Sequence, residues 1–115
     1  MIKVTFAHHK EAGTIILSAE GHAGQAEKGK DIICSAASIL AYTVAQYVKH
    51  VDKLGGIIAK PRIELEEGHM LIVATPTEEY LAEVLNAFFV AEVGYSLLAE
   101  NYPQYVELKM FGKAE

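Results

Sequence analysis

The sequence predicts one α+β domain of two layers, with its elements in the order ββαββαβ, a mixed sheet, and two helices on one face of that sheet. Three observations predict this fold. Alternating apolar and polar residues, typical of half-buried strands, occur in two pairs of short segments and in one last segment. A long apolar segment with helical spacing follows each pair. The 115 residues suit a single domain, 1–115, that buries its own core.

The first pair of strands is predicted from alternation. Ile2, Val4 and Phe6 alternate with polar residues, and residues 14–20 form the second strand. Residues 8–13 are polar and end in glycine, so we interpret them as the hairpin turn, with both of its histidines in that turn. Residues 21–30 contain three glycines and no periodicity, which indicates a mobile loop.

The first helix is predicted to follow Asp31, which would act as its N-cap, and to end at Gly55 and Gly56. His50 lies near its C-terminal end, where a cation is favoured by the helix dipole. Apolar residues occur on nearly every face of this helix. We therefore expect the sheet on one side and a second helix or a second subunit on the other.

The second half of the chain repeats the order of two strands and a helix. Residues 57–65 and 70–74 are the expected strands, joined by the turn 66–69. The run Thr75-Pro76-Thr77-Glu78 predicts a capping box with proline at the first helical position, and thus a helix over 76–100. Residues 105–110 alternate again and form the last predicted strand.

Composition limits the classes of partner. A hydrophobic fraction of 51% is high for so small a domain and favours a subunit interface, so we expect a homodimer. A net charge of −5 argues against direct binding of nucleic acid. A single cysteine fits a reducing compartment, and neither a signal peptide nor an uncharged run of ~20 apolar residues is present. We expect a cytoplasmic protein that does not enter a membrane.

Cys34 and His22 are the candidate catalytic residues. If Asp31 is the N-cap, Cys34 occupies the third helical position, where free backbone amides favour the thiolate and can hold an oxyanion. His22 lies twelve residues earlier and can act as general base and acid. Glycines in the intervening segment, Gly21 and Gly29 among them, allow the chain to fold back.

Each candidate also has a purely structural interpretation. Cys34 can be a packed core thiol, since free cysteine is often buried. His22 can be an exposed loop histidine, and Asp31 can serve as a cap without also orienting His22. Ser38 lies one helical turn after Cys34 and can simply bond to the backbone of its own helix.

Metal and cofactor sites are not expected. The possible ligands lack the short paired spacing of structural zinc sites; they are His8, His9, His22, His69 and Cys34. Neither the P-loop nor the dinucleotide-binding pattern of glycines is present. We therefore predict no metal and no cofactor.

Two short runs of the chain form a motif: Gly21-His22-Ala23 and, after a short glycine-containing loop, Gly29-x-Asp31-Ile32-Ile33-Cys34-Ser35-Ala36. In these runs the chain resembles the ribosomal-processing cysteine protease family, called Prp, whose motif is Gly-His-Ala followed by Gly-x-Asp-Ile-Val-Cys-Ala. Ile33 replaces the usual valine and Ser35 the usual alanine. Length and element order extend the resemblance to the whole chain, and its specific part is residues 21–38.

The resemblance implies a cysteine endopeptidase that removes a short N-terminal extension from ribosomal protein L-twenty-seven, a basic protein. It implies Cys34 as nucleophile, His22 as base, and a homodimer. The implied substrate segment is apolar and aromatic before the cut, with small residues after it. Two alternatives remain open: a non-catalytic ribosome-associated or peptide-binding module, and a thiol enzyme of other specificity, such as a small acyl transferase.

Overall fold

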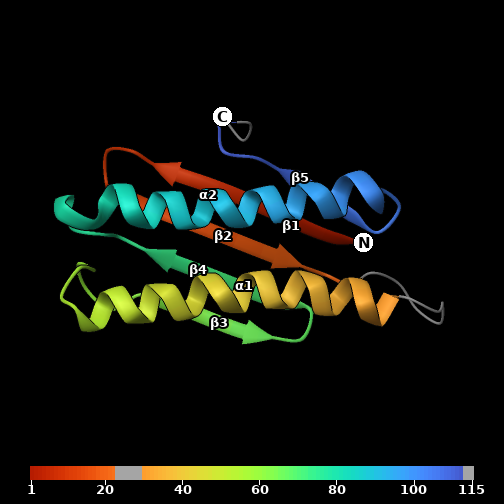
Figure 1. The fold of residues 1–115 in the computed structure, drawn as a ribbon, viewed down its shortest axis with the longest axis horizontal. Coiled ribbons are helices and arrows are strands. Elements are labelled where there is room, and N and C mark those ends of the chain that lie inside the picture. Colours follow the sequence, from red (N-terminus) through yellow and green to blue (C-terminus); the bar gives the residue numbers. More distant parts are fainter. Residues whose placement is uncertain (23–29, 113–115) are drawn as a thin grey trace.

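The computed structural model describes residues 1–22 and 30–112, and for Lys30 and Asp31 the backbone alone. It confirms the predicted order ββαββαβ (Figure 1). The elements are β1 (Ile2–His9), β2 (Thr14–Glu20), α1 (Lys30–Lys53), β3 (Arg62–Glu66), β4 (His69–Ala74), α2 (Glu78–Asn101) and β5 (Val106–Lys109).

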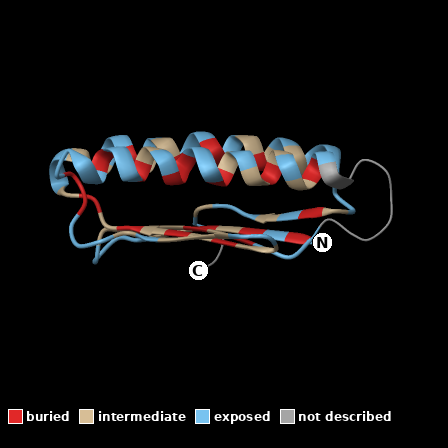
Figure 2. Cartoon of the chain, turned by 90° about the horizontal axis from the view of Figure 1, so that it is seen from below, coloured by how far each residue is buried: buried red, intermediate tan, exposed pale blue. Residues whose placement is uncertain are grey.

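The five strands form one mixed sheet in the order β3-β4-β2-β1-β5. Neighbouring strands are antiparallel except β5, which is parallel to β1. Both helices lie on one face of this sheet, as predicted, and their buried residues face the strands (Figure 2). The start of α1, the end of β2 and the turn between β3 and β4 meet at one end of the molecule (Figure 1). The residues at this end form the candidate site.

The core lies between the sheet and the two helices. Every second residue of β2 and β4, and of β1 as far as Phe6, is buried there, because successive strand side chains point to opposite faces. The largest fully buried side chain is Tyr95 of α2, whose ring packs at 5.8 Å from the ring of Phe6. Its hydroxyl donates a hydrogen bond of 2.6 Å to the carbonyl oxygen of Ala37 in α1. Tyr95 thus links the two helices about one turn from Cys34.

Replacement of Tyr95 by phenylalanine is expected to lower the free energy of unfolding by about 1 kcal/mol, because it removes one buried hydrogen bond and leaves the ring packing intact. Urea denaturation of the two proteins measures this difference. Phe88, which is also fully buried and carries no hydroxyl, offers a matched comparison: Phe88→Ala is expected to cost about 3–5 kcal/mol. An equal loss for both variants would contradict the assignment of a single hydrogen bond to Tyr95.

The first hairpin is tighter than predicted. His8 and His9 belong to β1, where they pair with Ile15 and Thr14, and only residues 10–13 form the turn. The backbone N–H of Gly13 closes this turn on the carbonyl oxygen of His9 at 2.8 Å. The prediction was wrong because polar side chains near a sheet end indicate exposure to solvent, which strand residues share with turn residues.

The third strand is shorter than predicted and begins at Arg62 instead of residue 57. Ile57 forms an isolated bridge with Pro76. Ala59 has φ 58°, a left-handed conformation that ends an extended segment, and Pro61 has no N–H to donate to a sheet ladder. Within 57–65, Ile57 is therefore buried as an isolated bridge residue, residues 58–60 are exposed, and strand structure is confined to the second half.

The predicted capping box at the second helix is also wrong. The helix begins at Glu78, and Thr77 is its N-cap without a side-chain capping bond. Pro76 precedes the cap and pairs with Ile57, so it cannot be the first helical residue. The hydroxyl of Thr75 lies 2.8 Å from that of Thr14 on β2. The Thr75 hydroxyl and the Pro76 backbone, which the predicted capping box would use, are thus engaged in tertiary contacts instead.

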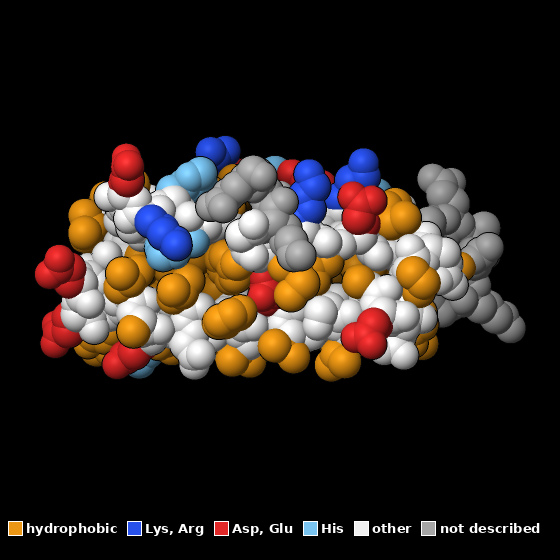
Figure 3. All heavy atoms as spheres, turned by 90° about the horizontal axis from the view of Figure 1, so that it is seen from above, with side chains coloured by type: hydrophobic (Ala, Val, Ile, Leu, Met, Phe, Trp, Pro, Cys, Tyr) orange, Lys and Arg blue, Asp and Glu red, His pale blue; other side chains and the backbone are white. Residues whose placement is uncertain are grey.

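Several large hydrophobic side chains of the two helices are exposed to solvent. They are Ile32, Ile39, Tyr42, Phe89, Val90, Val93 and Leu97. Viewed from the side of α2 and β5, hydrophobic side chains extend along the length of the visible face (Figure 3). By length and composition alone, Ile32–Lys53 and Glu78–Asn101 are also apolar enough to cross a membrane, a property that core helices of soluble proteins share. The absence of a membrane partner therefore stays a prediction.

Candidate active site

Cys34 lies near the start of α1 and is partly exposed. The helix begins at Lys30, so Asp31 lies in its first turn and not at the predicted N-cap, and Cys34 is the fifth helical residue instead of the third. An acidic residue is favourable in either position, because both lie near the positive end of the helix dipole. For this reason the sequence did not distinguish an N-cap position for Asp31 from a position in the first turn. Side chains of a helix tilt toward its N-terminus, so the thiol still projects over the first turn.

The structure brings Cys34 and His22 to the same small pocket, of about 60 Å³. Ser38 of α1 and Gly21 also line this pocket, so four of the six residues predicted for the site meet there. The full lining consists of Ile2, Ala19, Gly21, His22, Cys34, Ala37, Ser38, Glu67, Gly68 and Met70. The sequence spacing had allowed this meeting, and the fold produces it by placing the end of β2 beside the start of α1.

Cys34 also borders a second, shallower hollow on the outer side of α1, of about 410 Å³. It is lined by Cys34, Ser35, Ser38, Ile39 and Tyr42. The cysteine side chain packs partly against the core and partly faces these two hollows. The thiol thus packs against the core on one side, as the structural interpretation expects, and also borders open space, as a nucleophile requires.

His22 follows β2 by two residues, at a point where the chain bends away from the sheet. The bend depends on Gly21, which has φ 99° and whose missing Cβ would overlap the carbonyl oxygen of Met1. The backbone N–H of Gly21 donates a 2.9 Å hydrogen bond to the carbonyl oxygen of Gly68. The N-terminal amine of Met1 donates to the carbonyl oxygen of His22 itself.

Gly68 is a site residue that the sequence did not reveal. It lies in the turn between β3 and β4 with φ 78°. A Cβ at this position would lie 2.5 Å from Nε2 and 2.8 Å from Cε1 of His22, so the imidazole packs directly against the glycine backbone. The sequence indicated a turn glycine here. The contact of Gly68 with His22 joins segments that are far apart in the sequence, and no local pattern predicts it.

Two predicted parts of the site are not covered by these observations. Gly29 and residues 23–29 as a whole lie outside the described residues, as does the side chain of Asp31. The mobile loop over 21–30 and the orientation of His22 by Asp31 therefore stay predictions.

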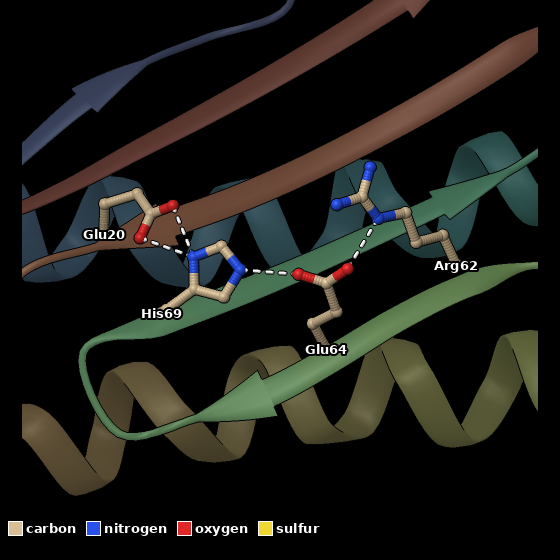
Figure 4. A network of polar contacts seen from close by, with 4 residues as sticks. All are labelled: Glu20, Arg62, Glu64 and His69. Carbon is tan, nitrogen blue, oxygen red and sulfur yellow. Dashed lines mark hydrogen bonds and ion pairs between the residues drawn. The ribbon is translucent and has the colours of Figure 1, made fainter.

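His69, which follows Gly68, lies between two carboxylates (Figure 4). Its Nδ1 is 2.7 Å from Oε1 and 2.9 Å from Oε2 of Glu20, and its Nε2 is 2.7 Å from Oε1 of Glu64. The Nε of Arg62 donates to the other oxygen of Glu64 at 2.6 Å. We call the three residues Glu20, His69 and Glu64 the carboxylate–histidine clamp.

The clamp favours the doubly protonated imidazolium, which donates one proton to each carboxylate. The hydrogen bonds to Glu64 and then Glu20 raise the pKa of His69 above its usual 6.5. The hydrogen bonds from His69 and then Arg62 lower the pKa of Glu64 below its usual 4.5. Since the two carboxylates bind opposite sides of the ring, they do not converge on one point. Among residues 1–22 and 30–112, no three acidic, histidine or cysteine side chains are grouped to hold a metal ion.

The clamp predicts how stability depends on pH. The contribution of His69 is complete below pH 6.5 and is lost as pH rises through its raised folded-state pKa. The contribution of Glu64 is complete above pH 4.5 and is lost as pH falls through its lowered pKa. The difference in Tm between wild type and His69→Gln should therefore be largest between pH 4.5 and 6.5 and decline on both sides.

Thermal unfolding from pH 3 to 9 measures this difference, with His9→Gln, an exposed histidine at the other end of the sheet, as the control. A difference that stays constant across the whole range would show that His69 contributes by packing and not by charge.

A larger cavity, of about 510 Å³, lies at the other end of β1, between His8, Leu85, Phe89 and Phe111. Cys34 and His22 are not among its lining residues. We assign the active site to the smaller pocket, because a thiol and an imidazole line it together. A thiol beside an imidazole and a helix N-terminus can carry out nucleophilic attack on a carbonyl group, with backbone amides near the developing oxyanion.

The chain is similar in sequence to proteins of one family of cysteine proteases. Residues 1–107 match the protein family described as "Cysteine protease Prp". A protein of Mycoplasma pneumoniae named "Ribosomal processing cysteine protease Prp" is 30% identical over 110 residues, which cover 95% of this chain and 94% of that protein.

Solved structures share the fold. The ribosomal processing protease Prp from S. aureus, crystallised with a covalently linked product peptide, superimposes with a TM-score of 0.69 at 24% identity, over 96% of this chain and 99% of that one. The same S. aureus protease with a substrate peptide gives a TM-score of 0.69 at 23% identity, with the same coverage. SMU.848 from Streptococcus mutans gives 0.67 at 27% identity, over 96% and 94% of the two chains.

Proposed function

Because this chain belongs to the Prp family of cysteine proteases, we propose that it is the endopeptidase that removes the N-terminal extension of ribosomal protein L-twenty-seven during assembly of the large ribosomal subunit. The observation that carries this proposal is the pocket that Cys34 and His22 line together at the start of α1. Cys34 is the single cysteine of the chain, so no other thiol can serve as the nucleophile.

In the proposed mechanism, His22 takes the proton of the Cys34 thiol as the sulfur attacks the scissile carbonyl carbon. Backbone amides at the start of α1 stabilise the oxyanion. The carbon–nitrogen bond then breaks, and His22 gives its proton to the leaving amine. Water attacks the resulting thioester, passes a proton to His22 and releases the new carboxylate, after which the thiol is restored.

Charge and shape support this substrate class. The chain has a net charge of −5, which favours encounter with a basic protein. Ile39 and Tyr42 border the outer hollow beside Cys34 and offer apolar surface to the aromatic and apolar residues that precede the cut. The M. pneumoniae relative is named for ribosomal processing, and the S. aureus protease has been crystallised with a product peptide covalently linked.

The test is incubation of the purified protein with ribosomal protein L-twenty-seven carrying an N-terminal extension, followed by mass spectrometry. We expect one cut, between the apolar segment and the mature protein. Peptide binding without any cleavage would support a non-catalytic peptide-binding module instead. Acyl transfer to an added amine, in preference to hydrolysis, would support a thiol enzyme of other specificity. Labelling of Cys34 by iodoacetamide at neutral pH gives an independent measure of thiol reactivity.

We also propose that the protein acts as a cytoplasmic homodimer. The exposed apolar residues on the outer side of the helices, among them Ile39, Val90 and Val93, support an interface with a second copy. Sedimentation equilibrium is expected to give twice the mass of 12.6 kDa. A monomer in solution would contradict this, and recovery of the protein with lipid vesicles would point to a membrane partner for the same surface.

A further inference from the structure

The carboxylate–histidine clamp is close in sequence to both segments that meet at the His22 ring, namely the end of β2 and the turn before β4. Glu20 precedes Gly21 and His22 directly, and His69 follows Gly68, against which the His22 ring packs. The segment that carries Glu20 thus also carries the imidazole, and the segment that carries His69 contacts it.

The clamp also joins three strands at the same end of the sheet. Glu20 of β2 and His69 of β4 are direct partners in the antiparallel register. Glu64 comes from β3, two residues before the residue that pairs with His69. Beyond the clamp, the hydrogen bond from Gly21 N–H to the Gly68 carbonyl oxygen continues the pairing toward His22. The turn of residues 67–68 is thus fixed against the end of β2 by one backbone hydrogen bond and by the charged contact between His69 and Glu20. The charged contact between His69 and Glu64 joins the two strands on either side of this turn.

The clamp does not line the catalytic pocket. Ala19 and Met70 line that pocket, and their strand neighbours Glu20 and His69 point to the opposite face of the sheet, which the helices leave uncovered. The clamp can therefore act on the imidazole through the backbone that it holds, and Gly68 is the part of that backbone in contact with the imidazole.

His22 needs such a support. It lies beyond the last residue of β2 and is exposed, so sheet pairing does not fix its ring. Catalysis by a thiol and an imidazole depends on their mutual placement, and a displacement of about 1 Å can lower the rate about 100-fold. The glycine backbone at residue 68 provides a surface that no other residue type would leave open, because any Cβ there would overlap the ring.

From these contacts we propose that His69, clamped between Glu20 and Glu64, is a positioning residue that holds Gly68 against the His22 imidazole and so keeps the catalytic base in place. This inference rests on the proposed function in so far as His22 is the base. The ring position itself is independent of that role, and the experiment below measures the two separately.

The first test compares His69→Gln with His9→Gln, which makes the same substitution on an exposed strand histidine away from the site. Two kinds of measurement are made at a temperature where both variants are folded by circular dichroism. One gives kcat and KM for the extended ribosomal protein, and the other gives the nuclear Overhauser effect between the His22 ring and the Gly68 α-protons. We expect His69→Gln to lower kcat about 10- to 100-fold with little change in KM, and to weaken the nuclear Overhauser effect. His9→Gln should change neither.

If His69→Gln does not fold, Glu64→Gln serves in its place, because it removes the negative charge from one clamp contact and leaves Glu20 paired with His69. A folded clamp variant with an unchanged nuclear Overhauser effect would overturn the proposal. Weakening of that signal in a protein whose His22→Ala variant remains active would support the positioning of the ring and contradict the proposed role of His22 as base.

A second test places Gly68→Ala in the wild type and in a His22→Ala background. Strain from the positive φ of residue 68 is present in both, whereas overlap with the imidazole exists only when His22 is present. We expect a larger loss of stability in the wild-type background. Equal losses in both backgrounds would show that Gly68 does not support the ring.

Discussion

Replacement of Cys34 by alanine is expected to abolish cleavage of the extended ribosomal protein, with kcat reduced about 10⁴-fold or more. The reason is that the chain contains no other cysteine, so no thiol remains to form the acyl-enzyme. Product formation followed by mass spectrometry over hours measures residual activity. Because Cys34 is only partly buried, the variant should remain folded, with a circular dichroism spectrum like that of the wild type.

Ser35→Ala is the matched control, since Ser35 is the next residue of α1, is exposed and also borders the outer hollow. It should keep nearly wild-type kcat, and it should still react with iodoacetamide, whereas Cys34→Ala should not. Cleavage by Cys34→Ala at the wild-type rate would disprove the covalent mechanism. Loss of activity in both variants together would place the defect in the local structure of α1 and not in the thiol.

Replacement of His22 by alanine is expected to lower kcat about 10³- to 10⁴-fold at neutral pH, because the imidazole that takes the thiol proton and returns it to the leaving amine is then missing from the pocket. Activity should recover in part as pH rises, since hydroxide in the solvent can deprotonate the thiol directly. The pH dependence of kcat/KM for wild type and variant measures this difference.

His9→Ala removes a histidine of β1 that lies at the far end of the sheet and should leave the pH profile unchanged. A His22→Ala variant with wild-type kcat and the wild-type pH profile would show that His22 is an exposed histidine without a part in the reaction. A loss of kcat that does not recover at any pH would favour a structural role of His22 in the pocket over proton transfer.

The chain order of the elements could be predicted from the sequence because it depends on local periodicity. Alternation over residues 14–20 and helical spacing over the two long apolar segments reflect which side each residue turns toward the core. The errors lie where tertiary contacts outweigh local signals. Pro76 satisfies every local rule for a first helical residue, yet its bridge to Ile57 keeps it outside α2.

The candidate site, like the fold, has residues that the sequence predicted and residues that it did not. Cys34, His22, Gly21 and Ser38 were identified from residue type and spacing, and the structure places all four on one pocket. Glu67 and Gly68 were interpreted only as turn residues. His69 was interpreted as the last residue of that turn and as a possible metal ligand, whereas it is the first residue of β4. These residues belong to the site because the β3–β4 hairpin pairs with β2. No local sequence pattern in either segment predicts that pairing.

The sequence by itself determined which residues carry chemistry and on which elements they lie, because thiol, imidazole and periodicity are properties of the chain alone. Only the tertiary structure decided what surrounds them. The contact of Gly68 with His22 and the pairing of Glu20 with His69, 49 residues apart, arise when β4 aligns with β2. Burial of the alternate side chains on the helix-facing side sets the register of these two strands. This register brings Gly68 against His22 and so fixes the position of the imidazole.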